Sequence, residues 1–496
     1  MNHDTICALA TANGIGAIGI IRISGEQSFE IVNRIFQGKN LETADSHTVH
    51  YGFIVDREIR DWEVITDDSK GGHEGERLSE NIVVQHQASD IRAEPIDEVM
   101  VSVFKAPKTF TAEDSVEISF HGSPHIAKKI LEVLIKNGAR MAKAGEFTMR
   151  AFMNGRIDLS QAESIADLIA SENEASRKVA LNQLKGGITN EISFLRTDLL
   201  NFVSLIELEL DFAEEDVEFA DRSALNQLLD KIEAKLSSLI ESFQYGNAIK
   251  NGTAVAIIGK PNAGKSTLLN ALLKEERAIV SNIAGTTRDT IEEILHIKGH
   301  AFRLIDTAGL RETVDEIEAI GVKKAKEKVA NANILVYLAD AATENFSEDI
   351  EMIKSLQRDD LKLIICATKI DEVLPHQYEL AENIFRAEIS QDFDFITISA
   401  VENQNIRDLK DELSSYVEQL QSEEGNVVIT NQRHYEALGK SLEAVDQVKN
   451  AITTQISTEL LAYELRNALE HLGEISGEVT NDEVLGNIFS KFCIGK

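Results

Sequence analysis

The sequence predicts a multidomain protein with an N-terminal α+β domain and a discontinuous all-α helical domain, into which an α/β domain with a mostly parallel sheet is inserted. The chain has 496 residues, too many for one ordinary core. Apolar residues recur every three or four positions on both sides of a middle region that has short β-branched runs instead. We expect domains at 1–154, at 155–250 plus 417–496, and at 251–416.

The composition, 43% hydrophobic and 27% charged, is typical of folded soluble proteins. No apolar stretch approaches the roughly 20 residues that span a bilayer, and the first residues lack a basic region followed by an apolar one. We therefore expect a cytoplasmic protein with no membrane contact. The three scattered cysteines suggest neither a disulfide framework nor a zinc site. A net charge of -33 disfavours non-specific nucleic-acid binding, so any RNA partner must meet a local basic patch.

The N-terminal part has strand candidates at 18–23, 99–104 and 116–120, around an early helix at 26–36. This mixture predicts a separate α+β domain. Residues 56–94 are rich in acids and glycines, have weak periodicity, and are interpreted as an acidic, exposed insertion.

Long helices are predicted next, because the five prolines leave 125–260 and 376–496 without any. A first apolar stripe has the spacing of one helical face and predicts core packing. It consists of Leu181, Leu184, Ile188, Ile192, Leu195, Leu199, Val203, Ile206 and Leu210. A second helical pattern is expected to stop near Gly246, and a third runs through 434–475.

The inserted domain has five short β-branched runs that alternate with helix-length segments, as in a parallel sheet covered on both faces. The runs are 254–258, 302–305, 334–338, 363–366 and 395–398. The first is followed by Gly-Lys-Pro-Asn-Ala-Gly-Lys-Ser at 259–266, which opens a helix. This context predicts a phosphate-binding P-loop, in which Lys265 faces the β- and γ-phosphates and Ser266 ligates magnesium. The nucleotide contacts expected from the loop are Asn262, Ala263, Gly264, Lys265, Ser266 and Thr267.

Further downstream elements occur in the order that a Ras-like GTPase needs. Thr287 lies on a predicted loop, where its hydroxyl can complete the magnesium shell. Asp306 and Gly309, in Asp-Thr-Ala-Gly, are placed to hold a magnesium-bound water and to sense the γ-phosphate. With Lys265, these two residues are the expected catalytic contacts. Together they indicate GTP hydrolysis.

Guanine choice is assigned to Thr368, Lys369 and Asp371, because a carboxylate can accept from both guanine N1–H and N2–H. Usual GTPases have Asn where this chain has Thr368. After the last strand, Ser399 and Ala400 can supply a backbone N–H to guanine O6.

The residue that positions the attacking water is not the usual one, since Leu310 stands where a Ras-like switch uses Gln. Glu318 is a candidate for this role, although a solvated acid on a helix face is the commoner meaning of such a residue. The spacing leaves both readings open.

With these motifs, the chain resembles the MnmE (TrmE) family of tRNA-modification GTPases over essentially its full length. The resemblance is carried by the motifs at 259–266, 281–289 and 306–312, by Arg-Ile-Ser-Gly at 22–25, and by Phe-Cys-Ile-Gly-Lys at 492–496. It implies a homodimer formed through the G domains and a potassium ion held by Asn262 with main-chain oxygens of Ser281, Ile283 and Thr286. Glu318 corresponds to the family's water-orienting glutamate.

The resemblance also implies a 5-formyl- or methylene-tetrahydrofolate site formed by Arg22, Glu117, Arg156 and Lys496. Arg156 stands where many relatives have Lys. The implied partner is an MnmG-type flavoprotein that carries FAD. With it, such a protein adds an aminomethyl or carboxymethylaminomethyl group to C5 of the wobble uridine of certain tRNAs. A ribosome-assembly GTPase that acts as a checkpoint is the alternative, but it would have no need of the folate contacts.

Overall fold

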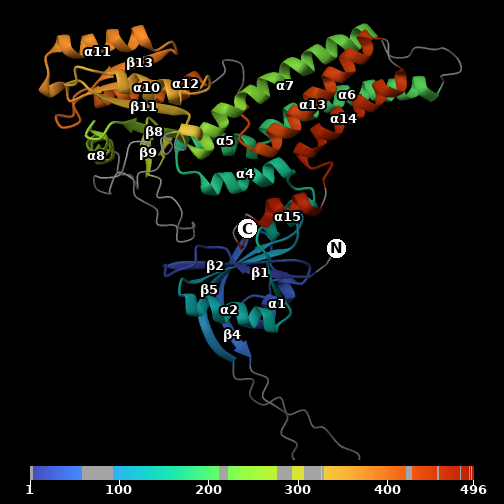
Figure 1. Cartoon of the computed structure of the whole chain (residues 1–496). Coiled ribbons are helices and arrows are strands. Elements are labelled where there is room, and N and C mark those ends of the chain that lie inside the picture. The colour runs from blue at the N-terminus through green and yellow to red at the C-terminus, as the bar shows by residue number, and fades with distance from the viewer. Residues whose placement is uncertain are drawn as a thin grey trace, which may run out of the picture. The chain divides into compact units, whose positions relative to one another are not determined.

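The computed structural model describes residues 4–57, 93–211, 222–275, 293–305, 326, 329–420, 427–454, 457–480, 482–490, 492, 494 and 495. The chain divides into two compact units, one of Met1–Asp158 with Thr480–Lys496 and the other of Leu159–Val479. The first is α+β, and the second combines a helical bundle with a parallel sheet (Figure 1), so the predicted fold class is confirmed. The finer three-domain boundaries stay a prediction.

The first unit contains a seven-stranded sheet in the order β3-β4-β5-β6-β2-β1-β7, antiparallel except for the β1–β7 pair. Its strands are β1 (Ile6–Leu9), β2 (Ile18–Ser24), β3 (Phe36–Gln37), β4 (Thr48–Arg57), β5 (Ala93–Phe104), β6 (Ser115–His121) and β7 (Arg140–Met141). The helices α1 (Ser28–Ile35) and α2 (Pro124–Lys136) bury their apolar faces against this sheet in one core. The remaining helices are α3 (Glu146–Met153) and α15 (Asp482–Ser490).

Three strands and one helix of this unit were predicted from the sequence. Most of the predicted insertion at 56–94 lies outside the described residues. Its two ends are strand residues, because Asp56 pairs with Glu94, and Arg57 with Ala93, where β4 meets β5.

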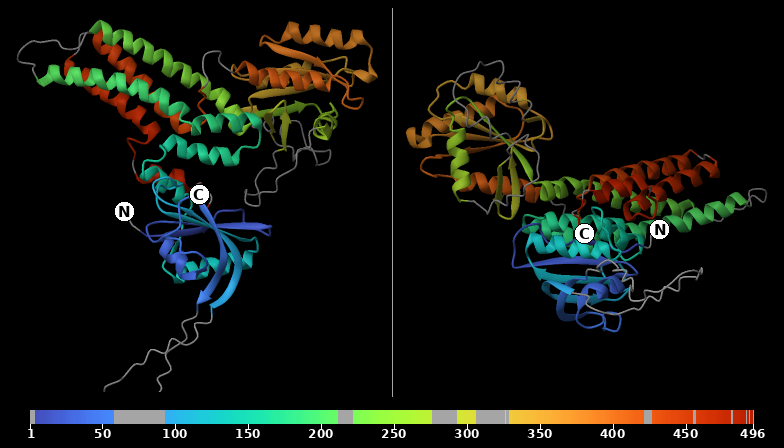
Figure 2. Two further views of the ribbon diagram at one scale, coloured as in Figure 1. Left: turned by 180° about the vertical axis from the view of Figure 1, so that it is seen from behind. Right: turned by 90° about the horizontal axis from the view of Figure 1, so that it is seen from below.

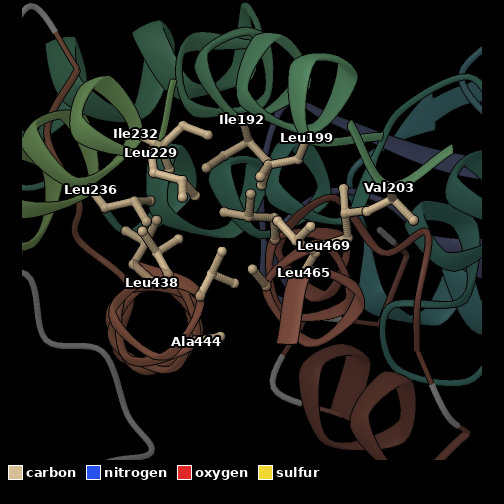
Figure 3. Close-up of a cluster of buried hydrophobic side chains, with 14 of the residues drawn as sticks. Ile192, Leu199, Val203, Leu229, Ile232, Leu236, Leu438, Ala444, Leu465 and Leu469 are labelled. Carbon is tan, nitrogen blue, oxygen red and sulfur yellow. The ribbon is translucent and has the colours of Figure 1, made fainter. Parts of the chain in front are cut away.

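The second unit contains a bundle of helices that pack against one another (Figures 1 and 2). They are α4 (Leu159–Ala170), α5 (Glu174–Leu184), α6 (Gly187–Asp211), α7 (Arg222–Asn251), α13 (Gln432–Thr453) and α14 (Thr458–Ser476). Figure 3 shows side chains of α6, α7, α13 and α14 pointing toward one another in their shared core, including Ile192, Leu236, Leu438 and Leu465. The predicted stripe of 181–210 thus faces a core, but it is shared by α5 and α6.

One predicted helix end is wrong. The second helical pattern was expected to stop near Gly246, but α7 continues to Asn251. The glycine has a packing role instead, because a Cβ at this position would lie 2.0 Å from the carbonyl oxygen of Ile429. Only glycine lets the buried segment of Ile429 approach the helix so closely.

The inserted sheet has the order β13-β12-β11-β8-β10-β9, and all neighbours are parallel except β9 and β10. Its strands are β8 (Thr253–Gly259), β9 (Glu293–Ile297), β10 (His300–Leu304), β11 (Ile334–Asp340), β12 (Lys362–Thr368) and β13 (Phe393–Thr397). The helices α8 (Lys265–Glu275) and α12 (Ile406–Gln419) bury apolar side chains with one face of the sheet, and α10 (Ser347–Leu356) and α11 (Pro375–Glu388) with the other. All five predicted runs form strands; β9 was not predicted. Among the described helices, none is long and apolar enough to cross a membrane.

Candidate functional site

The P-loop lies between β8 and α8, as the sequence predicts. Asn262 and Gly264 have positive φ angles of 66° and 93°, which turn the loop back toward the helix. Gly259 is needed for close packing, because a Cβ there would lie 2.5 Å from the carbonyl oxygen of Leu338. The Lys265 ammonium donates to the carbonyl oxygens of Gly259 at 2.5 Å and of Lys260 at 2.7 Å. It therefore points back across the loop, where the phosphates are expected.

The other phosphate-loop residues named from the sequence lie where the helix begins. Ala263 is buried, whereas the side chains of Ser266 and Thr267, in the first turn of α8, are exposed. A hydroxyl at a helix N-terminus can ligate a metal ion, and the aligned backbone N–H groups favour an anion there.

The residues assigned to base recognition from the sequence lie at the carboxyl end of β12, two strands away from the P-loop strand. Because β8, β11 and β12 are parallel, their carboxyl ends meet at one edge of the sheet. Thr368 is 4% exposed, and its hydroxyl donates to the carbonyl oxygen of Ala339 at 3.2 Å. Asp371 is exposed in the short 3₁₀ helix η3 (Ile370–Glu372). The structure therefore brings the P-loop and this segment to the same edge.

Lys369 is fixed in place by an acid that the sequence analysis did not single out. Its ammonium lies 2.6 Å from Asp340 Oδ2, at the end of β11, and this hydrogen bond raises the pKa of Lys369. Lys369 has a φ of 59°, a strained conformation for a residue with a side chain. The ion pair holds the lysine side chain at the edge of the sheet where the carboxyl ends of β8, β11 and β12 meet.

Ser399 and Ala400 follow β13 at the same edge of the sheet. The Ser399 N–H donates to the carbonyl oxygen of Gln404 at 3.2 Å, and its hydroxyl accepts from the Glu402 N–H at 3.2 Å. Ser399 therefore closes its own loop, and a donor for guanine O6 is expected from Ala400 instead.

A second feature missed by the sequence analysis is a set of polar contacts that links Lys260 of the P-loop to α10. Lys260 forms ion pairs with Glu348 at 2.8 Å and Asp349 at 2.9 Å, in the first turn of α10. The buried Tyr337 hydroxyl donates to Asp349 Oδ1 at 2.8 Å. Burial and the neighbouring carboxylate both raise the pKa of Tyr337, so the hydroxyl stays protonated as a donor. No sequence motif indicates these contacts, because α10 is remote from the P-loop in sequence.

The first unit contains a separate polar cluster that joins three of the four residues assigned to folate binding. Arg22 on β2 and Glu117 on β6 are cross-strand partners, with Arg22 Nε 2.9 Å from Glu117 Oε1. The Arg22 guanidinium lies 4.9 Å from the ring centroid of Phe110, and that of Arg156 lies 5.1 Å from the same ring. Arg156 Nη1 also donates to the Phe110 carbonyl oxygen at 2.6 Å. Phe110 is thus the centre of a cluster that sequence reasoning missed.

The electrostatics of this cluster favour an anionic ligand. Burial lowers the pKa of Arg156, and the positive charge of Arg22 lowers it further. Two cations are held beside one ring, and Glu117 compensates one of them. The C-terminal segment reaches the same unit, because Ile494 pairs with Ala144.

The remaining sequence-predicted site residues lie outside the described residues. They are Ser281, Ile283, Thr286, Thr287, Asp306, Gly309, Glu318 and Lys496.

Comparisons with known proteins match both units. Residues 5–156 match the family model "GTP-binding protein TrmE N-terminus", and residues 159–493 match "MnmE helical domain". The chain is 47% identical over 504 residues to the tRNA modification GTPase MnmE of Flavobacterium johnsoniae, covering 100% of both chains. It is 47% identical over 496 residues to that of Cytophaga hutchinsonii, covering 100% of this chain and 98% of the relative. Among solved structures, Era in complex with MgGDPNP and 16S ribosomal RNA nucleotides is 26% identical over 39% of this chain and 66% of Era, with a TM-score of 0.26.

Proposed function

Because this chain belongs to the MnmE family of tRNA modification GTPases, we propose that it is a potassium-stimulated GTPase that acts with an MnmG-type flavoprotein on the wobble uridine of certain tRNAs. The reaction adds an aminomethyl or carboxymethylaminomethyl group to C5 of that uridine, with a tetrahydrofolate as one-carbon donor and ammonium or glycine, respectively, as the source of the amine. The observation that carries this proposal is the occurrence of two sites in one chain: a P-loop edge in one unit and an arginine cluster around Phe110 in the other.

The nucleotide site fits GTP with magnesium. Lys265 supplies a charge to the β- and γ-phosphates, and the exposed Ser266 hydroxyl would ligate magnesium together with Thr287. Asp371 would accept from guanine, beside Lys369. In hydrolysis, Glu318 would orient the attacking water, and Asp306 and Gly309 would act on the magnesium shell and the γ-phosphate.

Potassium is assigned to Asn262 with the main-chain oxygens of Ser281, Ile283 and Thr286. Asn262 stands at the exposed turn of the P-loop, where its φ of 66° reverses the chain. A monovalent cation beside the β- and γ-phosphates offsets the negative charge that develops in phosphoryl transfer. It would replace the arginine that other GTPases supply.

The folate site is assigned to Arg22, Glu117 and Arg156, with Lys496. A reduced folate is an anion with a donor-rich pterin ring. The Glu117 carboxylate can accept from such donors, and the two guanidiniums can hold carboxylates. Binding of an anion would relieve the repulsion between Arg22 and Arg156, which supports the assignment. A ribosome-assembly factor would have no use for this cluster.

The partners are a second copy of the chain, an MnmG-type flavoprotein that brings FAD, and tRNA, in the cytoplasm. An exposed apolar face of the first unit supports dimerisation. Val49 and Tyr51 on β4 are 55% and 58% exposed, and Met100, the cross-strand partner of Tyr51, is 45% exposed. Such contiguous apolar side chains are typical of contact surfaces. The dimer contact between G domains inferred from the family would be additional.

The test is a reconstitution with purified protein, the flavoprotein, NADH, GTP, undermodified tRNA, ammonium or glycine as the amine, and a reduced folate labelled with ¹³C in its one-carbon group. Mass spectrometry of the tRNA nucleosides should show the label in a modified wobble uridine. Omission of GTP or folate should abolish it. Modified uridine without the label would overturn the folate assignment, and unmodified tRNA in the complete mixture would overturn the function. Arg22→Gln should weaken folate binding but leave GTP affinity intact, as should deletion of Ile494–Lys496.

A further inference from the structure

The helix α7 belongs to two cores of the second unit. Leu225, Leu229 and Leu236 are fully buried in the core of the helical bundle. Near the other end, Ala248 is buried in a core that includes Val255 of β8 and side chains of α8. A continuous helix packed in both cores moves as one body, because close-packed interiors deform little.

The end of α7 is also linked directly to the nucleotide site. After Asn251, one residue separates the helix from β8, which runs from Thr253 to Gly259, the first residue of the P-loop motif. A change in the position of the P-loop strand therefore changes the position of the last turn of α7. This turn carries Ile249 and Lys250.

The last turn is anchored to α4 by an ion pair. Lys250 Nζ lies 2.8 Å from both oxygens of Asp167, and the two side chains are 30% and 18% exposed. Burial raises the pKa of Asp167, and the charge of Lys250 opposes this effect. Partly desolvated partners depend on each other more than surface pairs do, because the loss of one leaves the other charge uncompensated.

One turn earlier, α4 is fastened to the rest of the bundle. Glu163 lies 10% exposed and accepts from Arg433 at 3.0 and 2.8 Å, and from His434 at 2.8 Å. Arg433 also donates to the carbonyl oxygen of Ile475 at the end of α14. Residues four apart share one helix face. The same face of α4 therefore contacts α13 through Glu163 and the end of α7 through Asp167.

A cavity of about 130 Å³ lies beside the Asp167–Lys250 pair. Its walls include Asp167, Ser176, Ala180, Ile249, Lys250 and Thr430. Most interior shifts require neighbouring side chains to repack. Here the end of α7 is packed against β8 and α8 but has space on the side of α4, so the ion pair fixes its position against that helix.

The chain also connects α4 to the other site. Arg156, of the folate cluster, precedes the first residue of α4, Leu159, by three positions. We infer that Asp167 and Lys250 are positioning residues that couple the nucleotide state of the P-loop, through α7 and α4, to the uridine-modification step. This inference rests on the proposed function. The pair has no role in GTP hydrolysis itself.

The experiment compares modified uridine formed per GTP hydrolysed in the reconstituted system. In Lys250→Gln and Asp167→Asn, GTP turnover should stay within about twofold, whereas modified uridine per GTP should fall about tenfold, within the usual range of coupling between sites. Lys250→Arg, which keeps the charge, should retain most of the ratio. The matched control is Lys449→Gln, which removes ion pairs with Asp230 and Glu233 elsewhere along α7. Its ratio should not change.

Two results would overturn the inference: an unchanged ratio in Lys250→Gln, whether GTP turnover and modification stay the same or fall equally, or a loss in Lys250→Arg as large as in Lys250→Gln. An equal fall would indicate that the pair only stabilises the fold. Absence of modified uridine with the unaltered protein would overturn the proposed function, and this inference with it. An unchanged ratio in the variants would overturn the inference alone.

Discussion

Replacement of Gly246 by alanine tests its close contact with Ile429. The sequence pattern wrongly predicted a helix end near this glycine. An added Cβ would lie 2.0 Å from the carbonyl oxygen of Ile429 and 2.7 Å from its carbonyl carbon. Non-bonded heavy atoms prefer about 3.5 Å, so the two backbones must separate by about 1.5 Å. The Ile429 segment resists, because its N–H donates to the buried Ser242 hydroxyl at 3.1 Å. Overpacking costs up to about 3 kcal/mol and alanine gains about 1 kcal/mol as a helix former, so we expect a net loss of about 2 kcal/mol.

Gly439 in α13 is the matched control, since an added Cβ there meets no atom within 4 Å. Gly439→Ala should stabilise by about 0.5–1 kcal/mol, the ordinary helix-propensity gain. Urea unfolding followed by circular dichroism at 222 nm measures both, because α7 and α13 share one hydrophobic core. The two midpoints should move in opposite directions. A Gly246→Ala protein as stable as the unaltered one would refute the reasoning.

Three further predictions concern the P-loop, the α4 contact and the segment assigned to base recognition. GTP hydrolysis should be faster in potassium than in sodium, and Asn262→Ala should lose this difference; equal rates of the unaltered protein in both salts would exclude potassium. Burial raises the pKa of Glu163, but His434 and Arg433 outweigh this effect and lower it to about 2, from an ordinary value of 4.5. Because the pKa of Glu163 is lower in the folded than in the unfolded protein, its ionised carboxylate stabilises the fold. This stabilisation is complete above pH 4.5 and is lost as the pH falls toward 2. It amounts to about 3 kcal/mol. Glu163→Gln should therefore flatten the acid side of a plot of urea midpoint against pH, and parallel curves would contradict this. Asp371→Asn should weaken GTP binding about 10- to 100-fold and improve xanthosine triphosphate binding, because an amide can donate to the xanthine 2-oxo group. Competition against a fluorescent nucleotide measures both, and unchanged GTP affinity would remove Asp371 from base recognition.

The parts of the fold that could be predicted are those in which local chemistry determines structure. The P-loop follows from glycines, a lysine and a serine at fixed spacing after an apolar run, and Asn262 and Gly264 have the positive φ angles that such a turn needs. Five of the six strands of the inserted sheet follow from β-branched runs. By contrast, β9 pairs with β10 in an antiparallel hairpin, and its sequence, Glu-Ile-Leu-His-Ile, is short and mixed.

The parts that could not be predicted depend on contacts between distant segments. Phe110 belongs to no sequence motif. Its ring contacts Arg22 and Arg156 only in the folded protein, where β2 and the segment before α4 lie close together. The same holds for Gly246, whose partner is 183 positions away at Ile429. Sequence periodicity reports one helix at a time, so a glycine that admits another backbone looks the same as one that ends a helix.

Thr368 shows how a departure from the usual motif is accommodated. Its Cβ lies 4.0 Å from the position that a Cβ on Gly264 would take, so the residue packs beside the P-loop. Its hydroxyl donates to Ala339 of β11, which ties the carboxyl ends of β12 and β11 together. A longer amide side chain would make such connections by hydrogen bonds. Here packing and one hydroxyl hold the edge together, and we propose that base choice depends on the exposed carboxylate of Asp371. We therefore propose that a threonine at this position affects how firmly the nucleotide is held more than which base is selected.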